Sequence, residues 1–507
     1  MRYAALIVGL LVEALAFGQG FNKRYDAFGL EGPQGSFGIE YTPAGYAVLG
    51  ASEDLDSLGP DSFFFHASVV LTFIDDQGVH LSTKRAFRPW QNTAPGWANC
   101  CDTIPGGGFI IGAGSQDTVN VFEVYLMRFD AQGDTIWTRA FGGAGEFWIG
   151  RQVKRTPDGG FLVVGDTDAN GNTDGFVLKT DGSGEEEWRE TYSGGGLSDY
   201  LMAIDMVGNG DYFCGGQRRM SVDDKDLWVL RIDSTGAVRW TRSWGSSFDE
   251  PNAHLITLAD GHVLVASAWG YADEFNAIRP YLAKLDSTDG STIWDHEYGP
   301  IALGTSFFAA KERNNGDIIA CGVSYVSFHQ QGLLLRATST GDSLWMRTYY
   351  YQDTLIADGT GRFYDVLPTD DGGFIAAGVA YNPAGAPYPP GYSADTWVVK
   401  VDSLGCIVPG CDAVGVQEVV TNLGNSLTVY PNPAHGSATM EVQLPQSMHG
   451  NSALRLVLVN GQGQVAMEQA GKEGGNTLDL SGIAAGLYYV HLANGTTWLA
   501  GAKLVVE

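Results

Sequence analysis

A short apolar segment that begins with glycine recurs along most of the chain, and this repeat limits the fold more than any other feature. Seven copies are present: GYAVLG (45–50), GGFIIG (107–112), GGFLVVG (159–165), GDYFCGG (210–216), GHVLVAS (261–267), GDIIACG (316–322) and GGFIAAG (372–378). Short apolar runs bounded by glycine are typical of β-strands. Self-similarity at a period of about 50 residues indicates an array of repeated strand units.

A second strand-like segment follows most copies and ends in a turn, as in VLKTDGSG and VLRIDSTG. Asp at the first turn position and Gly at the fourth suit a type I turn with a bulge. In five units a tryptophan stands four residues after this glycine: Trp137, Trp188, Trp240, Trp294 and Trp345, which are 51 to 54 residues apart. The period and the four short strands within it predict β-propeller blades. We expect the tryptophans to pack between neighbouring blades.

The two ends of the repeat region predict how the ring closes. The seventh unit has no tryptophan strand, whereas residues 21–29, FNKRYDAFG, resemble WTRAFGG and have no unit before them. We expect this N-terminal segment to complete the seventh blade, because pairing the first and last segments removes an exposed sheet edge. The predicted fold class is all-β, with a seven-bladed β-propeller over residues 21–412 and a small C-terminal β-sandwich.

The tail has a different pattern. After a linker at residues 413–425, alternating strands fill residues 426–507. Its motifs are Tyr430-Pro431-Asn432-Pro433, VNGQGQV, LDLSGIAAGLYYV and a closing segment that begins at Lys503. These motifs resemble the C-terminal sorting domain of Bacteroidota proteins that the type IX secretion system exports. The resemblance implies the type IX secretion machinery as a partner, secretion or display on the outer cell surface, and attachment to surface lipopolysaccharide after the tail is removed.

The N-terminus, MRYAALIVGLLVEALAFGQG, is typical of a signal peptide at residues 1–20. No later segment has about 18 uninterrupted apolar residues, so no transmembrane segment is predicted. The formal net charge of -28 makes nucleic acid a poor partner, because a phosphate backbone would be repelled.

Six cysteines are present, and export permits disulfides. Cys406 and Cys411 stand close together in LGCIVPGCD, and we expect them to form a local disulfide. Cys214 and Cys321 hold matching positions in two repeats, which favours buried free thiols. Cys100 and Cys101 are adjacent, and a strand would point them to opposite faces.

One loop has the spacing of a cation site. Asp166, Asp168, Asn170, Asn172 and Asp174 follow one another in DTDANGNTD. Oxygen ligands at alternate positions with a glycine at the sixth suit calcium, and the spacing resembles calcium loops of integrin-type propeller blades. The alternative is a solvated hairpin tip, since Asp, Asn and Gly also dominate turns. A calcium ion here would be structural.

The sequence assigns no catalytic residue. It lacks the G-x-S-x-G, H-E-x-x-H and G-x-x-x-x-G-K-[ST] motifs. The repeats also resemble the tryptophan-docking propellers of quinoproteins, but their longer period and the lack of an identifiable catalytic Asp argue against that activity. The expected function is a binding or adhesion module with a glycan or protein ligand. An enzyme that acts on polysaccharides, as a hydrolase or lyase through loop carboxylates, is the alternative, and a purely structural role stays open.

Overall fold

The computed structural model describes residues 20–25, 34–59, 62–88, 91–117, 121–143, 145–193, 197–208, 210–221, 224–272, 277–300, 302–326, 329–351, 360–382, 393–408, 411, 427–444, 454–460, 464–494 and 497–507. The predicted signal peptide, except for Gly20, and the predicted linker at 413–425 lie outside these residues. Within the described part, no helix is long and apolar enough to cross a membrane.

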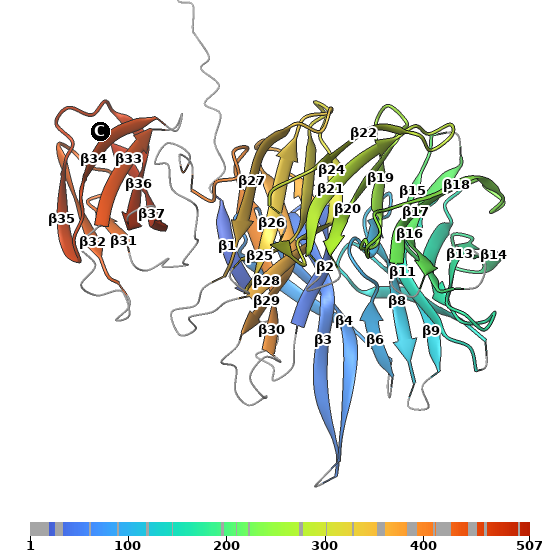
Figure 1. Cartoon of the computed structure of the whole chain (residues 1–507). Coiled ribbons are helices and arrows are strands. Elements are labelled where there is room, and N and C mark those ends of the chain that lie inside the picture. Colours follow the sequence, from blue (N-terminus) through green and yellow to red (C-terminus); the bar gives the residue numbers. More distant parts are fainter. Residues whose placement is uncertain are drawn as a thin grey trace, which may run out of the picture.

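Seven antiparallel sheets stand around a ring, and two smaller sheets form the tail, coloured orange to red in Figure 1. The described residues therefore confirm the all-β class and the seven-bladed propeller followed by a small sandwich. In blades 1 to 6 the chain runs from the axis outwards through successive hairpins, whereas the outermost strand of blade 7 comes from the start of the repeat region.

Blades 1 to 3 take up the first part of the ring. Blade 1 consists of β2 (Gln34–Thr42), β3 (Gly45–Gly59), β4 (Ser62–Ile74) and β5 (His80–Ala86). Blade 2 consists of β6 (Asn92–Pro95), β7 (Cys101–Thr103), β8 (Phe109–Gln116), β9 (Phe122–Phe129) and β10 (Thr135–Phe141). Blade 3 consists of β11 (Trp148–Arg155), β12 (Phe161–Thr167), β13 (Asp174–Thr180) and β14 (Glu186–Tyr192). The β3–β4 hairpin projects beyond the ring (Figure 1).

Blades 4 to 6 follow in chain order. Blade 4 consists of β15 (Asp199–Met206), β16 (Tyr212–Ser221), β17 (Asp224–Ile232) and β18 (Val238–Trp244). Blade 5 consists of β19 (His254–Thr257), β20 (Val263–Ala272), β21 (Ala277–Leu285) and β22 (Thr292–Glu297), with β23 (Ala302–Leu303) paired to β21. Blade 6 consists of β24 (Ser306–Glu312), β25 (Ile318–Val326), β26 (His329–Ala337) and β27 (Ser343–Tyr349).

Blade 7 combines the two ends of the repeat region. It consists of β28 (Thr360–Pro368), β29 (Phe374–Asn382), β30 (Ser393–Val401) and, as its outermost strand, β1 (Phe21–Tyr25). Strand β1 pairs antiparallel with β30, from Phe21 opposite Lys400 to Tyr25 opposite Thr396. The indole N–H of the fully buried Trp397 donates to Asn22 Oδ1 at 2.6 Å. The expectation that the N-terminal segment completes this blade is thus confirmed for residues 21–25, while residues 26–29 lie outside the described part of the chain.

The repeated tryptophans pack on the neighbouring blade, as the sequence predicted. Each ring lies against the turn glycine of the next unit, so close that a Cβ on that glycine would be 2.8 to 3.1 Å from the ring. The pairs are Trp137 with Gly184, Trp188 with Gly236, Trp240 with Gly290, Trp294 with Gly341 and Trp345 with Gly405. Phe21 takes the same place against Gly78, which joins blade 7 to blade 1.

The tail is a two-sheet sandwich. One sheet consists of β31 (Leu427–Tyr430), β32 (Ser437–Val442) and β35 (Gly474–Asp479), and the other of β33 (Leu454–Asn460), β34 (Val465–Ala470), β36 (Gly486–Asn494) and β37 (Thr497–Val506). Alternate residues face inwards, as in β32, where Ala438, Met440 and Val442 are buried. These residues belong to one apolar core that both sheets share.

Deleting residues 20–25 should destabilise the whole ring, because blade 7 would lose its outer strand and leave β30 as an open edge. We expect a single melting transition shifted down by several degrees, measured by circular dichroism. Lys84→Ala, which removes an exposed ion pair with Asp134 away from the closure, serves as the control, since surface substitutions usually change stability by within about 0.5 kcal/mol. An unchanged melting temperature in the deletion variant would contradict the closure.

Candidate functional site

A cavity of about 760 Å³ opens at the axis of the ring. All seven blades line it, and its rim includes the tight turns after β24 and β28. Pockets that bind small ligands usually have volumes of about 300 to 1,000 Å³. We call this space the channel cavity.

One side chain from the innermost strand of each blade reaches the wall of the channel cavity at an equivalent position of the strand register. These residues, here called the channel ring, are Glu40, Asp102, Lys154, Asp205, Ile256, Lys311 and Leu367. Five of the seven are charged, which is unusual for the inside of a folded chain. The cavity is therefore a polar site.

Several carboxylates near the axis hold neighbouring blades together. Their oxygens accept hydrogen bonds from backbone N–H groups of the next blade: Arg155 to Asp102 at 2.8 Å, Thr257 to Asp205 at 2.7 Å and Ile39 to Asp365 at 3.1 Å. Gln152 does the same with its amide oxygen for the N–H of Ile204, at 2.6 Å. Charge-assisted bonds of this kind are stronger than neutral ones, so these carboxylates have a structural task.

Glu40 and Lys154 are not used in this way. Neither accepts from or donates to a neighbouring backbone group among the described residues, and the nearest partner of Glu40 is the thiol of Cys101, 3.9 Å away. Burial raises the pKa of Glu40 to about 7, Lys311 and Lys154 oppose the shift, and Asp365 adds to it. Burial alone would lower the pKa of Lys154, but nearby carboxylates, led by Asp102, raise it above its ordinary value. Lys154 is thus a cation at neutral pH.

An aromatic cluster lies farther along the innermost strands, and its members are not among the residues that line the channel cavity. Phe37, Phe308 and Tyr364 sit at β-bulges of β2, β24 and β28, and Trp97 joins them from blade 2. Phe308 and Tyr364 are stacked with centroids 5.5 Å apart, while Trp97 meets Tyr364 edge-on at 5.2 Å. Trp97 also contacts Phe308 of blade 6, which is not an adjacent blade, so the cluster lies across the axis. Phe37, Phe308 and Tyr364 each precede the channel-ring residue of their strand by three positions, about 10 Å along a strand.

The predicted calcium loop lies between β12 and β13, and its side chains are largely used by protein groups. Asp166 is buried and receives both Nε and Nη2 of Arg151, at 2.8 and 2.9 Å. Asp168 Oδ1 accepts from the N–H of Phe147 at 2.7 Å, and Asn170 Nδ2 donates to Asp174 Oδ2 at 3.2 Å.

The same loop does not gather its oxygens around one point. Among the described residues, no group of three or more His, Cys, Asp or Glu side chains is arranged to hold a metal ion. The remaining predicted ligand, Asn172, adds an amide at the exposed tip. This geometry favours the hairpin interpretation, and calcium binding at the loop stays a prediction.

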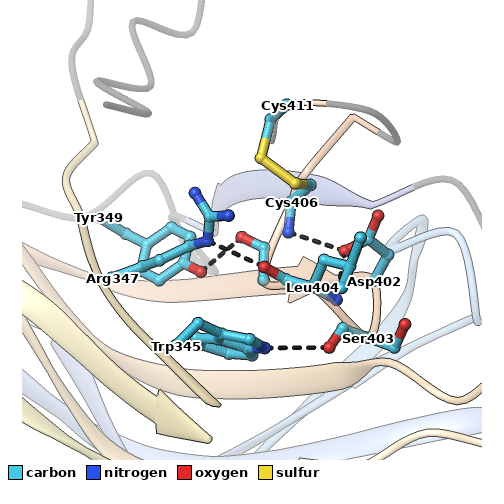
Figure 2. Close-up of a disulfide and its surroundings, with 9 residues drawn as sticks. Trp345, Arg347, Tyr349, Asp402, Ser403, Leu404, Cys406 and Cys411 are labelled. Carbon is cyan, nitrogen blue, oxygen red and sulfur yellow. Dashed lines mark hydrogen bonds between the residues drawn. A yellow bond between two sulfur atoms is a disulfide. The ribbon is translucent and has the colours of Figure 1, made fainter. Parts of the chain in front are cut away.

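Cys406 and Cys411 are joined by a disulfide, whereas Cys100, Cys101, Cys214 and Cys321 are free and buried. Figure 2 shows that the bridge begins directly after the turn at 402–405, on which blade 6 docks. Three donors of β27 reach this turn: Trp345 Nε1 to Ser403 O at 3.0 Å, Arg347 Nε to Leu404 O at 2.9 Å and Tyr349 Oη to Gly405 O at 2.7 Å. The disulfide therefore fixes the end of the ring next to a blade contact.

The predicted sorting residues come together in the tail, although about 70 residues separate them in the sequence. Asn432 Nδ2 donates to the carbonyl of Lys503 at 2.8 Å, and Asn432 Oδ1 accepts from the N–H of Val505 at 2.9 Å. Tyr430 and Lys503 are exposed beside this contact. The Tyr430-Pro431-Asn432-Pro433 motif and the C-terminal strand thus form one structural unit.

Sequence reasoning missed the channel ring. Its members are single residues from seven separate strands, and no two of them are close in the chain. A signal was present, because each stands a few residues before the glycine of a glycine-led strand. An alignment of the seven repeats that included the residues before each glycine-led strand would have placed the channel-ring residues in one column, and therefore at the same level along the axis.

Asp205→Ala should lower the free energy of unfolding by about 1 to 3 kcal/mol, because the N–H of Thr257 would lose its acceptor. The measurement is chemical denaturation, with Asp205→Asn retaining part of the stability through its amide oxygen. Asp370→Ala at the exposed rim is the matched control, and we expect little change there. Equal stability of Asp205→Ala and Asp370→Ala would contradict the role of Asp205 in holding neighbouring blades together.

Asn432→Ala should loosen the tail, because two hydrogen bonds to the C-terminal strand are removed together. We expect faster proteolysis of the tail in the purified protein and a smaller secreted fraction in the native host. His435→Ala, which removes only an exposed contact to Glu507, is the control. Wild-type secretion and protease resistance of the Asn432 variant would contradict the role of this contact.

Two family models match the chain. The model described as "Secretion system C-terminal sorting domain" matches residues 428–507, and the model described as "Outer membrane protein assembly factor BamB" matches residues 123–359. No curated protein sequence matches.

Three solved structures are similar over much of their length but with low scores. PorZ, described as an essential bacterial surface component of the type-IX secretion system of Porphyromonas gingivalis, has 8% identity and a TM-score of 0.23, covering 94% of this chain and 99% of that one. The WD40 domain of SCAP from fission yeast has 9% identity and a TM-score of 0.33, covering 76% and 98%. Quinohemoprotein alcohol dehydrogenase from Comamonas testosteroni has 12% identity and a TM-score of 0.31, covering 92% and 72%.

The sorting-domain match coincides with the sandwich and includes the Asn432 contact. It indicates export to the cell surface or the medium through the type IX secretion machinery. The chain is a β-propeller protein that carries a type IX secretion C-terminal sorting domain.

Proposed function

We propose that the exported propeller is a binding or adhesion module whose ligand enters the channel cavity. The observation that supports this most is the cavity itself, which all seven blades line. A rigid, polar, concave site formed by several elements is the usual setting of a ligand site. Attachment to surface lipopolysaccharide after removal of the tail belongs to the same proposal.

The composition of the cavity favours a polar glycan or a peptide segment. Lys154 offers an ammonium group that has no hydrogen bond or ion pair with another described residue. Glu40 offers a carboxyl group in the same cavity. Asn314 and Asp370 add an amide and a carboxylate at the exposed rim. Such groups can exchange hydrogen bonds with hydroxyl, carboxylate or amide groups of a ligand.

An enzyme that acts on polysaccharides is the second candidate, and one observation favours it. The pKa of Glu40, raised by burial to about 7, suits a general acid at neutral pH. Glycosidases need a second carboxylate at a suitable distance, free to act as base or nucleophile. Asp102, the nearest member of the channel ring in sequence, instead accepts backbone N–H groups of Thr103 and Arg155. Binding is therefore the better supported function.

Lys154→Met and Asn314→Trp should each weaken binding at least tenfold in a glycan and peptide array probed with the chain from residue 20. The first removes the free cation, and the second obstructs the rim without touching the ring of hydrogen bonds. Lys84→Ala, which removes a surface ion pair with Asp134, is the control and should bind normally.

Three results distinguish the alternatives. Wild-type binding by both cavity variants, with unchanged melting temperatures, would move the ligand site away from the cavity. New reducing ends released from a polysaccharide, and lost in Glu40→Gln, would support the enzyme. If Lys154→Met loses binding and also melts at a much lower temperature, unfolding could explain the loss. Asn314→Trp then decides, because residue 314 lies at the exposed rim and its substitution should leave the fold intact.

A further inference from the structure

A carboxylate pair with no role in the channel cavity lies at the corner between blades 4 and 5. Glu250 stands in the connection from β18 to β19 and is fully buried, with a relative exposure of 0%. Its Oε1 accepts two hydrogen bonds, from the N–H groups of Ser246 and Gly270, both at 3.0 Å. Its Oε2 has no hydrogen-bond partner.

The unpartnered oxygen faces a second carboxylate. Glu250 Oε2 and Asp226 Oδ1 lie 2.1 and 2.4 Å from the point that a Cβ on Gly245 would occupy. Both oxygens thus converge on the same small space, which is open because residue 245 is glycine. Two carboxylates this close repel each other unless a proton or a cation lies between them.

The basic side chains nearby are committed to other groups. Lys225 pairs with Asp249 at 2.6 Å. Arg218, opposite Asp226 in the β16–β17 hairpin, lies over the ring of Trp228 at 4.4 Å and toward Asp199. Among the described residues, no ion pair joins Lys225 or Arg218 to Glu250 or Asp226.

At the corner between blades 2 and 3, a half-buried glutamate approaches a glycine equally closely, but its oxygen has a hydrogen-bond donor. There Glu146 Oε2 lies 2.1 Å from the Cβ point of Gly143, as Glu250 Oε2 does for Gly245. In that corner, however, the indole N–H of Trp148 donates to Glu146 Oε2 at 2.8 Å. Near Glu250 Oε2, the carboxylate of Asp226 lies where Glu146 has the indole N–H of Trp148 as its donor.

We propose that Glu250 and Asp226 bind a calcium ion between them, at the corner of blades 4 and 5. Calcium is a hard cation that takes carboxylate oxygens, backbone carbonyls and water in a flexible arrangement. The two side chains supply two of the oxygens, and water completes the shell. Asp226 is only partly buried, which leaves the ion a path from solvent. This site is independent of the ligand in the channel cavity.

The raised pKa values of both groups agree with this geometry. Burial raises the pKa of Glu250 to about 7, with Asp226 adding to the shift, and burial and Asp224 raise the pKa of Asp226 to about 6. A bound divalent ion would reverse both shifts by stabilising the charged forms.

The test uses the chain from residue 20, stripped with EDTA and titrated with calcium at pH 7.5. Calcium should raise the melting temperature by several degrees and bind with a Kd near the roughly 10⁻⁴ to 10⁻³ M of extracellular calcium modules. Glu250→Gln and Asp226→Asn should each weaken binding at least tenfold. Glu146→Gln is the matched control and should bind calcium normally.

Other results would overturn the proposal. One is a melting temperature that calcium does not change. Another is calcium binding that survives in both the Glu250 and Asp226 variants but is lost in Asp168→Asn, which would place the ion in the β12–β13 loop. A shared proton would instead cause stability to fall as the pH rises from about 4 to 7 without calcium having any effect, because acids with raised folded pKa values stabilise the fold only while protonated. Asp226 is exposed enough that its asparagine variant should fold even if Glu250→Gln does not.

Discussion

Closure of the ring by β1 and β30 is the constraint on which the rest of the propeller depends. Without β1, the last blade would have three strands, and β30 would be left as an exposed sheet edge. Phe21 and Tyr25 make this junction resemble the other blade contacts, with Phe21 against Gly78 and Tyr25 Oη donating to Gly78 O at 2.8 Å. Tyr349 makes the equivalent bond to Gly405 O at 2.7 Å. The junction between the chain ends is therefore built like an ordinary blade interface.

The chemistry at the axis follows from the same need to hold blades together. Innermost strands come closest to one another there, so backbone N–H groups that face a neighbouring blade need acceptors, and Asp102, Asp205 and Asp365 supply them. The polar groups of the cavity that take no part in these contacts between blades are Glu40, Lys154 and the groups at the rim. A cavity with few free polar groups on a rigid wall is suited to recognition, because its geometry needs little rearrangement when a ligand binds.

Much of the propeller fold could be predicted from the sequence, because the same local sequence signals recur from blade to blade. Glycine-led strands, Asp-x-x-Gly turns and the tryptophans at fixed spacing are short-range features, and the resemblance of residues 21–29 to the tryptophan strand indicated the closure. The channel ring, the Trp97 contact with Phe308 and the pair of Glu250 and Asp226 depend on positions far apart in the chain. The loop from Asp166 to Asp174 shows the reverse problem, since its ligand-like spacing conceals the pairing of Asp166 with Arg151. Tight turns and calcium-binding loops both favour Asp, Asn and Gly, so these residue types alone do not distinguish the two.

Hydrogen exchange of the folded chain, read by mass spectrometry of its peptides, tests the closure most directly. If β1 is an integral strand of blade 7, amides in residues 20–25 and 393–401 should exchange together and slowly, in the same cooperative opening as the rest of the ring. Exchange of residues 20–25 within seconds, while residues 393–401 stay protected, would show that the N-terminal strand frays independently and that another contact holds the ring shut.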